Sequence, residues 1–125
     1  MKFSTRTLDL FQRRRYQGLT FEPDVTAMSG SFGTGRFAII GLTCRNGAVA
    51  EARYRTFNCI SVIAAADWVC EWAHGRNHGE LSKLTTQQVL EALDGLPTSR
   101  EFCAHLVRTA LLQAAAEAKK KGVLL

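Results

Sequence analysis

Two stretches in the first half of the chain alternate between polar and apolar positions, and this alternation predicts β-strands. In AVAEARYRTF (48–57) charged side chains alternate with alanine and tyrosine, which is typical of a strand with one buried and one wet face. RFAIIGLT (36–43) precedes it, and the intervening Asn46-Gly47 is a strong signal for a two-residue hairpin turn. With a further short strand expected over 25–29, the pattern predicts an antiparallel sheet of three strands.

The second half of the chain has helical signals instead. Residues 59–73 are apolar on almost every side, which predicts a buried helix with Asn58 as its N-cap. Capping-box patterns begin at Thr85 and at Thr98. They predict a helix over 86–94 and a last helix that runs to about Lys120.

The order of these elements predicts the fold class. A short helix is expected over 4–16, and RNHGE (76–80) is expected to be a loop. Strands followed by helices favour an α+β domain, with a three-stranded antiparallel sheet and helices packed on one face. The 125 residues contain no internal repeat, so we expect one domain over 1–125.

Composition and charge narrow the function classes. Apolar residues make up 46% of the chain, but no apolar run is long enough to span a membrane, and no secretory signal is visible. A cytoplasmic location with reduced thiols is therefore expected. The net charge of +5 includes the runs 13–15 and 119–121. These predict solvated surfaces or docking of an acidic partner, and no nucleic-acid motif accompanies them.

The cysteines are the candidate reactive residues. Cys59 is expected at the first helical position and Cys103 in the second turn of the last helix. A helix start favours a thiolate, and the two residues could converge at one end of the molecule. The alternative is two buried structural cysteines, because free cysteine is among the most buried residue types. Cys44 and Cys70 are interpreted as structural.

Three stretches of the chain carry a family resemblance. "YRTFNCISVIAAADWVCEWAHGR", "LPTSREFCAHLVRTALLQAA" and "LDLFQRRRYQG" resemble motifs of the NifU/IscU-type iron–sulfur cluster assembly scaffold family. The resemblance runs over nearly the whole chain. It implies a single NifU N-terminal/IscU-like domain of the IscU/SufE fold type. It also implies a role in iron–sulfur cluster assembly beside a cysteine desulfurase or other assembly proteins.

The resemblance also implies a ligand set. The family's site has three cysteines, an aspartate and, in many members, a histidine. Cys59 and Cys103 match the second and third cysteines, and are therefore the candidate metal ligands for an iron–sulfur cluster or zinc. Gly33, Gly35 and Phe102 stand where the first cysteine, the aspartate and the histidine are expected.

Two thiolates leave such a site open, because clusters and structural zinc take about four ligands. A partner chain, a small thiol, or a second protomer of a homo-oligomer could complete it. Two functions follow as alternatives. One is a divergent scaffold that handles iron, cluster or persulfide sulfur through Cys59 and Cys103. The other is a non-catalytic adaptor of the same fold that docks a partner through its basic surface without metal.

Two further expectations concern catalysis and docking. An enzyme is not expected, because no base is paired with Cys59 and His105 should point away from Cys103. Leu96, Pro97 and Arg100 keep part of the family's chaperone-recognition motif, so they are the candidate partner-binding residues.

Overall fold

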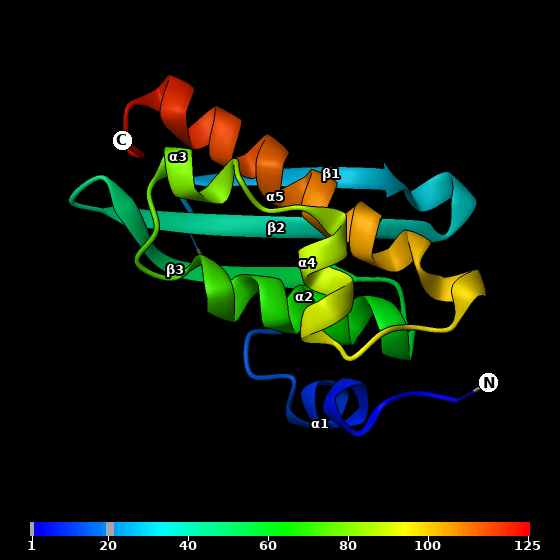
Figure 1. The fold of residues 1–125 in the computed structure, drawn as a ribbon. Helices are drawn as coiled ribbons and strands as arrows, with labels where there is room; N and C mark the ends of the chain where they lie inside the picture. Colours follow the sequence, from blue (N-terminus) through cyan, green and yellow to red (C-terminus); the bar gives the residue numbers. More distant parts are fainter. Residues whose placement is uncertain (1, 20–21) are drawn as a thin grey trace.

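Three antiparallel strands form the sheet of this computed structural model, which describes residues 2–19 and 22–125 (Figure 1). The strands are β1 (Val25–Ser31), β2 (Arg36–Arg45) and β3 (Ala48–Thr56), in the order β1-β2-β3. Asn46 and Gly47 join β2 to β3 with φ angles of 56° and 79°. Both residues are left-handed, as the tightest hairpin turns require, so the sequence signal predicts the turn correctly.

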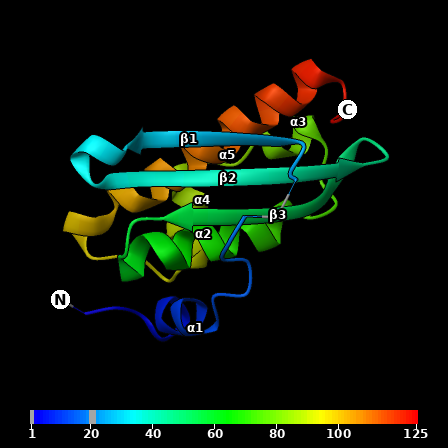
Figure 2. The ribbon, with the colours of Figure 1, turned by 180° about the vertical axis from the view of Figure 1, so that it is seen from behind.

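Helices cover one face of this sheet, and the opposite face carries no helix among the described residues (Figure 2). The two long helices, α2 (Ile60–Ala73) and α5 (Phe102–Lys121), contact the strands and each other, while α1 (Thr5–Arg13) packs against α2. The predicted α+β class is confirmed. The shorter elements are η1 (Phe32–Thr34), α3 (His78–Leu81), α4 (Thr86–Ala92) and η2 (Thr98–Arg100).

The starts of the two long helices differ from prediction. Asn58 is not the N-cap of α2. Cys59 takes that place with extended backbone angles, φ −150° and ψ 133°, and its carbonyl accepts the N–H of Ile63 at 3.0 Å. The predicted capping box at Thr98 is also wrong, because a separate 3₁₀ turn forms there and α5 begins only at Phe102.

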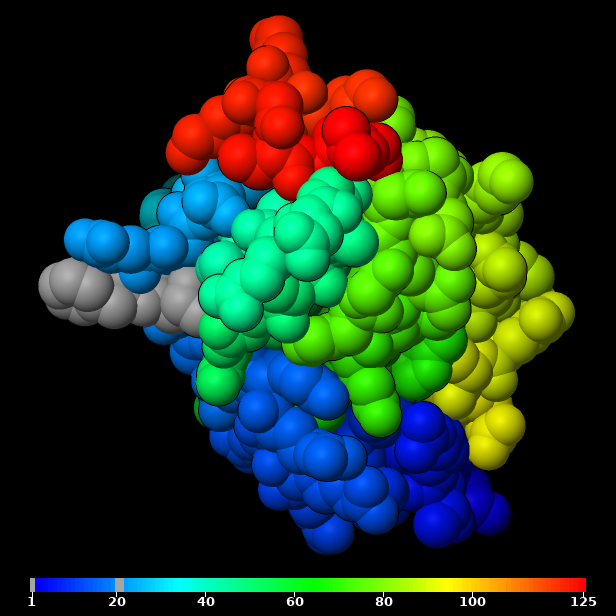
Figure 3. Space-filling model, turned by 90° about the vertical axis from the view of Figure 1, so that its left-hand side faces the viewer, coloured from blue at the N-terminus to red at the C-terminus, as the bar shows by residue number. Residues whose placement is uncertain are grey.

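The expected loop over 76–80 is in part the short helix α3. Asn77 caps it reciprocally: its side chain accepts the N–H of Glu80 at 3.0 Å, and its own N–H donates to the Glu80 carboxylate at 3.1 Å. The backbone of Leu125 joins α3 to the hairpin, because its carbonyl accepts from His78 and its N–H donates to Gly47. Figure 3 shows the C-terminal residues beside the hairpin at this end.

The core lies between the sheet and the two long helices, and α2 is buried along nearly its whole length. Asp67 is the one charged residue among the fully buried positions of α2. Its Oδ1 accepts the N–H of Tyr16 at 2.9 Å, which fastens the segment after α1 to the helix. None of the helices in the described residues has the length and apolar character needed to cross a bilayer.

Burial raises the pKa of Asp67, so the folded state disfavours its charged form. Below the pKa that Asp67 has in the unfolded chain, the carboxyl is protonated in both states and the free energy of unfolding is undiminished. As the pH rises through the higher pKa of the folded state, the buried carboxyl becomes charged and the free energy of unfolding falls. Asp67→Asn keeps an oxygen for the Tyr16 N–H but carries no charge. We therefore expect this variant to be more stable than wild type at pH 7, with a gain that shrinks toward pH 4.

Urea denaturation at both pH values measures the difference. Glu117→Gln removes an exposed charge from α5 and is the matched control, expected to stay within about 0.5 kcal/mol of wild type. An Asp67→Asn variant less stable than wild type at pH 7 would contradict this account of the buried carboxylate.

Candidate functional site

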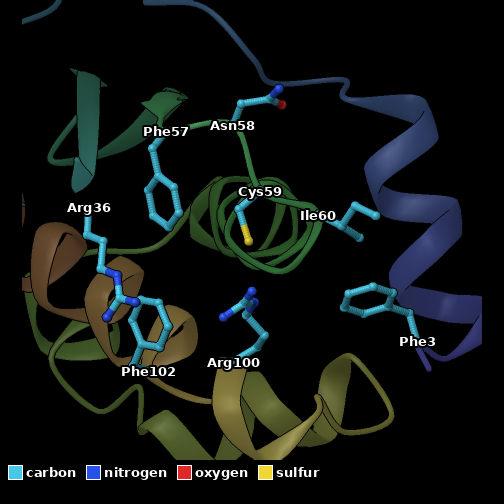
Figure 4. A pocket seen from close by; sticks show the side chains of 8 residues that line it. All are labelled: Phe3, Arg36, Phe57, Asn58, Cys59, Ile60, Arg100 and Phe102. Atoms are coloured by element: carbon cyan, nitrogen blue, oxygen red, sulfur yellow. The ribbon is translucent and has the colours of Figure 1, made fainter. Parts of the chain in front are cut away.

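Cys59 stands at the junction of β3 and α2, on the wall of a pocket of about 350 Å³. As an N-cap it makes no side-chain hydrogen bond to the helix, so its thiol is free to point elsewhere. Figure 4 shows the sulfur directed into the pocket, toward Arg100. The other lining residues are Phe3, Arg36, Phe57, Asn58, Ile60 and Phe102.

Cys103 is fully buried as the second residue of α5, next to Phe102, which lines the pocket. It therefore falls in the first turn of its helix and not in the second as expected. Burial, followed by the charge and hydrogen bonding of the Cys59 side chain, raises the pKa of the Cys103 thiol to about 12. Arg100 and Arg36 act in the opposite direction but are outweighed. Cys103 is thus a neutral thiol at pH 7.

The packing of α2 against α5 brings together two cysteines that are far apart in the sequence. This convergence is what the positions of Cys59 and Cys103 near two helix starts predict. Their role as metal ligands remains a prediction. The two thiols differ in environment, because Cys59 is only half-buried and faces the pocket while Cys103 has no exposed surface.

The rest of the pocket is basic and aromatic. The Arg36 guanidinium lies 4.6 Å from the centre of the Phe102 ring, and the Arg100 guanidinium faces the Cys59 sulfur between Phe102 and Phe3 (Figure 4). Phe57 continues toward Phe37, with ring centres 6.5 Å apart. Such a lining suits an anionic or soft ligand held near a thiol. The sequence offered no signal for Phe3 or Arg36, since neither belongs to a recognisable motif.

The residues at the remaining family ligand positions cannot bind metal through side chains. Gly33 lies in η1 and Gly35 follows it with φ 73°, in the turn between β1 and β2. Phe102 offers only a ring face. Among the described residues no group of three or more histidine, cysteine, aspartate or glutamate side chains is placed to hold a metal ion.

Nor do the other thiols and His105 join the pair. Cys70 is fully buried, and Cys44 lies near the hairpin end of β2, where its N–H donates to Asp24. His105 is exposed, and its Nδ1 lies 3.5 Å from the hydroxyl of Thr86. These positions agree with the prediction that Cys44, Cys70 and His105 are not part of the site.

The three candidate partner-binding residues divide between two hollows. Leu96 and Pro97 line a shallow hollow with Asp94 and Phe3, and Leu96 also packs on the core. Arg100 instead reaches into the thiol pocket. Because Phe3 lines both hollows, they adjoin each other. A partner bound at Leu96 and Pro97 would therefore lie next to Cys59.

Comparison with known proteins decides the family. The model of the NifU-like N-terminal domain family matches residues 2–123. The chain belongs to this family. This NifU-like domain is 29% identical over 120 residues to an iron-sulfur cluster assembly scaffold protein IscU of Archaeoglobus fulgidus, covering 96% of the chain and 78% of that relative. It is 27% identical over 125 residues to IscU of Escherichia coli K12, covering 97% of each.

Solved structures agree on the fold of this NifU-like domain. The N-terminal part of a NifU-like protein from Brucella abortus superimposes with a TM-score of 0.74 at 18% identity, covering 94% of each chain. The family resemblance and the fold type expected from the sequence are both confirmed.

Restoring two of the replaced family positions should create a metal site. A Cβ on Gly35 meets no atom within 4 Å, and one on Gly33 meets only the Ser31 hydroxyl at 3.4 Å. Gly33→Cys with Gly35→Asp therefore fits the turn, and aspartate tolerates a left-handed backbone better than most residues. Beside Cys59 and Cys103, the introduced side chains complete the four ligands that structural zinc takes.

Zinc titration with elemental analysis measures the effect. We expect the double variant to bind one equivalent of zinc per chain, at least about tenfold more tightly than wild type. Adding Cys59→Ser to the double variant is the control and should abolish the gain. Equal zinc affinity in wild type and the double variant would contradict the view that the glycines account for the missing site.

Proposed function

We propose that this chain takes part in iron–sulfur cluster assembly as a divergent member of the scaffold family, and that Cys59 accepts sulfur there. The observation that carries the proposal is the thiol pair itself. Cys59 faces a pocket with two arginines, and the buried Cys103 thiol interacts with the Cys59 side chain. Relatives that are named as assembly scaffolds match nearly the whole chain, and this supports a role in the same assembly process.

Sulfur arrives in this proposal by persulfide exchange. The Cys59 thiolate attacks the outer sulfur of a donor persulfide, a new S–S bond forms on Cys59, and the donor leaves as a thiolate. The proton of the donor's persulfide remains with the transferred sulfur. No oxidant is needed, because one S–S bond replaces another and the outer sulfur keeps its oxidation state. Arg36 and Arg100 balance the negative charge that passes through the pocket.

Iron and the cluster are cargo in this proposal, and the chain supplies only part of their coordination. Two thiols cannot satisfy a cluster or zinc alone, and the described residues offer no third ligand beside them. A cluster or zinc ion at Cys59 and Cys103 therefore requires ligands from a partner, a small thiol or a second copy of the chain.

The adaptor alternative is less favoured, because the two basic runs do not form one surface. Arg13 and its neighbours lie at α1, whereas Lys121 and its neighbours end α5 on the far side of the molecule (Figure 1). Arg13 also pairs with Asp9 at 3.2 Å, and Lys121 donates to the carbonyl of Asp24 at 2.7 Å. The runs are dispersed solvated charges in this arrangement.

The partner proposed for this step is a cysteine desulfurase, since that class carries a protein-bound persulfide. A cytoplasmic location agrees with four free cysteines in the chain. For the acceptance of sulfur itself we propose a stoichiometric acceptor and not an enzyme. The described residues that line the pocket around Cys59 include no imidazole or carboxylate that could serve as a catalytic base.

A sulfur-transfer assay tests the proposal. A purified cysteine desulfurase is charged with radiolabelled cysteine, freed of small thiols and mixed with the chain. We expect label to leave the desulfurase with wild type and with the control Cys44→Ser, but not with Cys59→Ser, because only Cys59 faces the pocket. Loss of label that is unchanged in Cys59→Ser, or no loss with wild type, would contradict the proposal.

A further inference from the structure

The pair of thiols is suited to a reaction that needs two cysteines and no more. Cys59 is half-buried with its sulfur in the pocket. Cys103 is fully buried in the first turn of α5, next to Phe102 of the pocket lining, and its thiol interacts with that of Cys59. The described residues bring no third metal-binding side chain to them. Two cysteines are too few to ligate a cluster, but they are all that the formation of a disulfide requires.

We propose that Cys103 reduces a persulfide held on Cys59, which releases the outer sulfur as sulfide and leaves a Cys59–Cys103 disulfide. The inference rests on the proposed function, because Cys59 must first accept the sulfur. It adds an activity to that function: the chain would itself convert bound sulfur into sulfide, the oxidation state that cluster assembly consumes.

The step balances within the pair. The Cys103 thiol passes its proton to the outer sulfur of the persulfide as its own sulfur attacks the inner sulfur, Cys59 Sγ, and the bond from Sγ to the outer sulfur breaks. The outer sulfur leaves with the bonding electrons and is reduced, while the two cysteines are oxidised to the disulfide. The proton of Cys103 goes to the leaving sulfur, so the product is hydrogen sulfide. A dithiol reductant then restores both thiols for another cycle.

The surroundings of the pair suit each part of this step. Cys59 makes no capping hydrogen bond, so its side chain can rotate toward Cys103 without breaking one. The pocket of about 350 Å³ leaves room for an outer sulfur atom and for its departure. Arg36 and Arg100 are close enough to stabilise the anionic leaving group. Burial protects Cys103 from competing oxidants and keeps its thiol for its neighbour.

A single-turnover experiment tests the inference. Reduced protein is mixed with cysteine hydropersulfide as the probe, excess probe is removed, and released sulfide is measured while intact mass and peptide mapping locate the sulfur. For wild type we expect sulfide equimolar with a Cys59–Cys103 disulfide. In Cys103→Ser and Cys103→Ala the sulfide release should be lost, and Cys59 should keep one extra sulfur. Cys44→Ser is the matched control and should behave as wild type.

The outcomes separate this inference from the proposed function. Wild type that keeps a stable persulfide on Cys59, as the Cys103 variants do, would overturn the inference while Cys59 remains the sulfur acceptor. No sulfur on Cys59 in any of the proteins would overturn both. Peptide mapping of wild type requires no variant, so the test holds even where a substitution at the buried Cys103 prevents folding.

Discussion

The burial of α2 is the constraint on which the rest of the molecule depends. This helix is apolar on nearly every side, so it is stable only when other elements surround it. The sheet, α1 and α5 do so, and small residues such as Ala65 and Ala114 allow them to approach closely. Because β3 leads almost directly into α2, burying the helix also fixes where its first residue lies. The position of Cys59 is therefore a consequence of core packing.

The same packing makes the two cysteines unequal. Cys103 enters the core with the first turn of α5 and loses its contact with water, which raises its pKa and keeps it neutral. Cys59 stays at the edge, where the cavity and two guanidinium groups surround its sulfur. An accessible thiol beside a buried one, with no third metal-binding side chain placed with them among the described residues, is an incomplete metal site. The pair of thiols is better suited to receiving a sulfur atom on Cys59 and then reducing that sulfur with electrons from both cysteines.

Much of the fold was predictable because its signals are local. Asn46-Gly47 requires a tight hairpin, the alternation in β3 requires one buried face, and the apolar run of α2 requires an interior position. Helix starts were less predictable, because side-chain caps compete with backbone geometry. Asn58 has the right chemistry for a cap, yet Cys59 occupies the position. The capping box at Thr85 was predicted correctly, whereas the one at Asn77 was not, because it opens a helix too short to show periodicity.

The site was predictable only in part. The convergence of Cys59 and Cys103 followed from their places near two helix starts, and the family resemblance gave that convergence a meaning. The basic and aromatic character of the pocket did not follow. Arg36, Phe3 and Arg100 come from a strand start, the N-terminal segment and a 3₁₀ turn. Only the folded chain brings them to one cavity, so no spacing in the sequence could reveal it.

Iron and sulfide retention is the measurement that tests the central claim most directly. The chain is incubated anaerobically with ferrous iron, cysteine and a cysteine desulfurase, desalted, and analysed for iron, sulfide and visible absorption, with an IscU relative in parallel. The two-thiol site predicts sulfur exchange at Cys59 without a retained chromophore. A stable chromophore that survives desalting in wild type and is lost in both Cys59→Ser and Cys103→Ser would show that these two thiols hold a cluster, and would contradict the account.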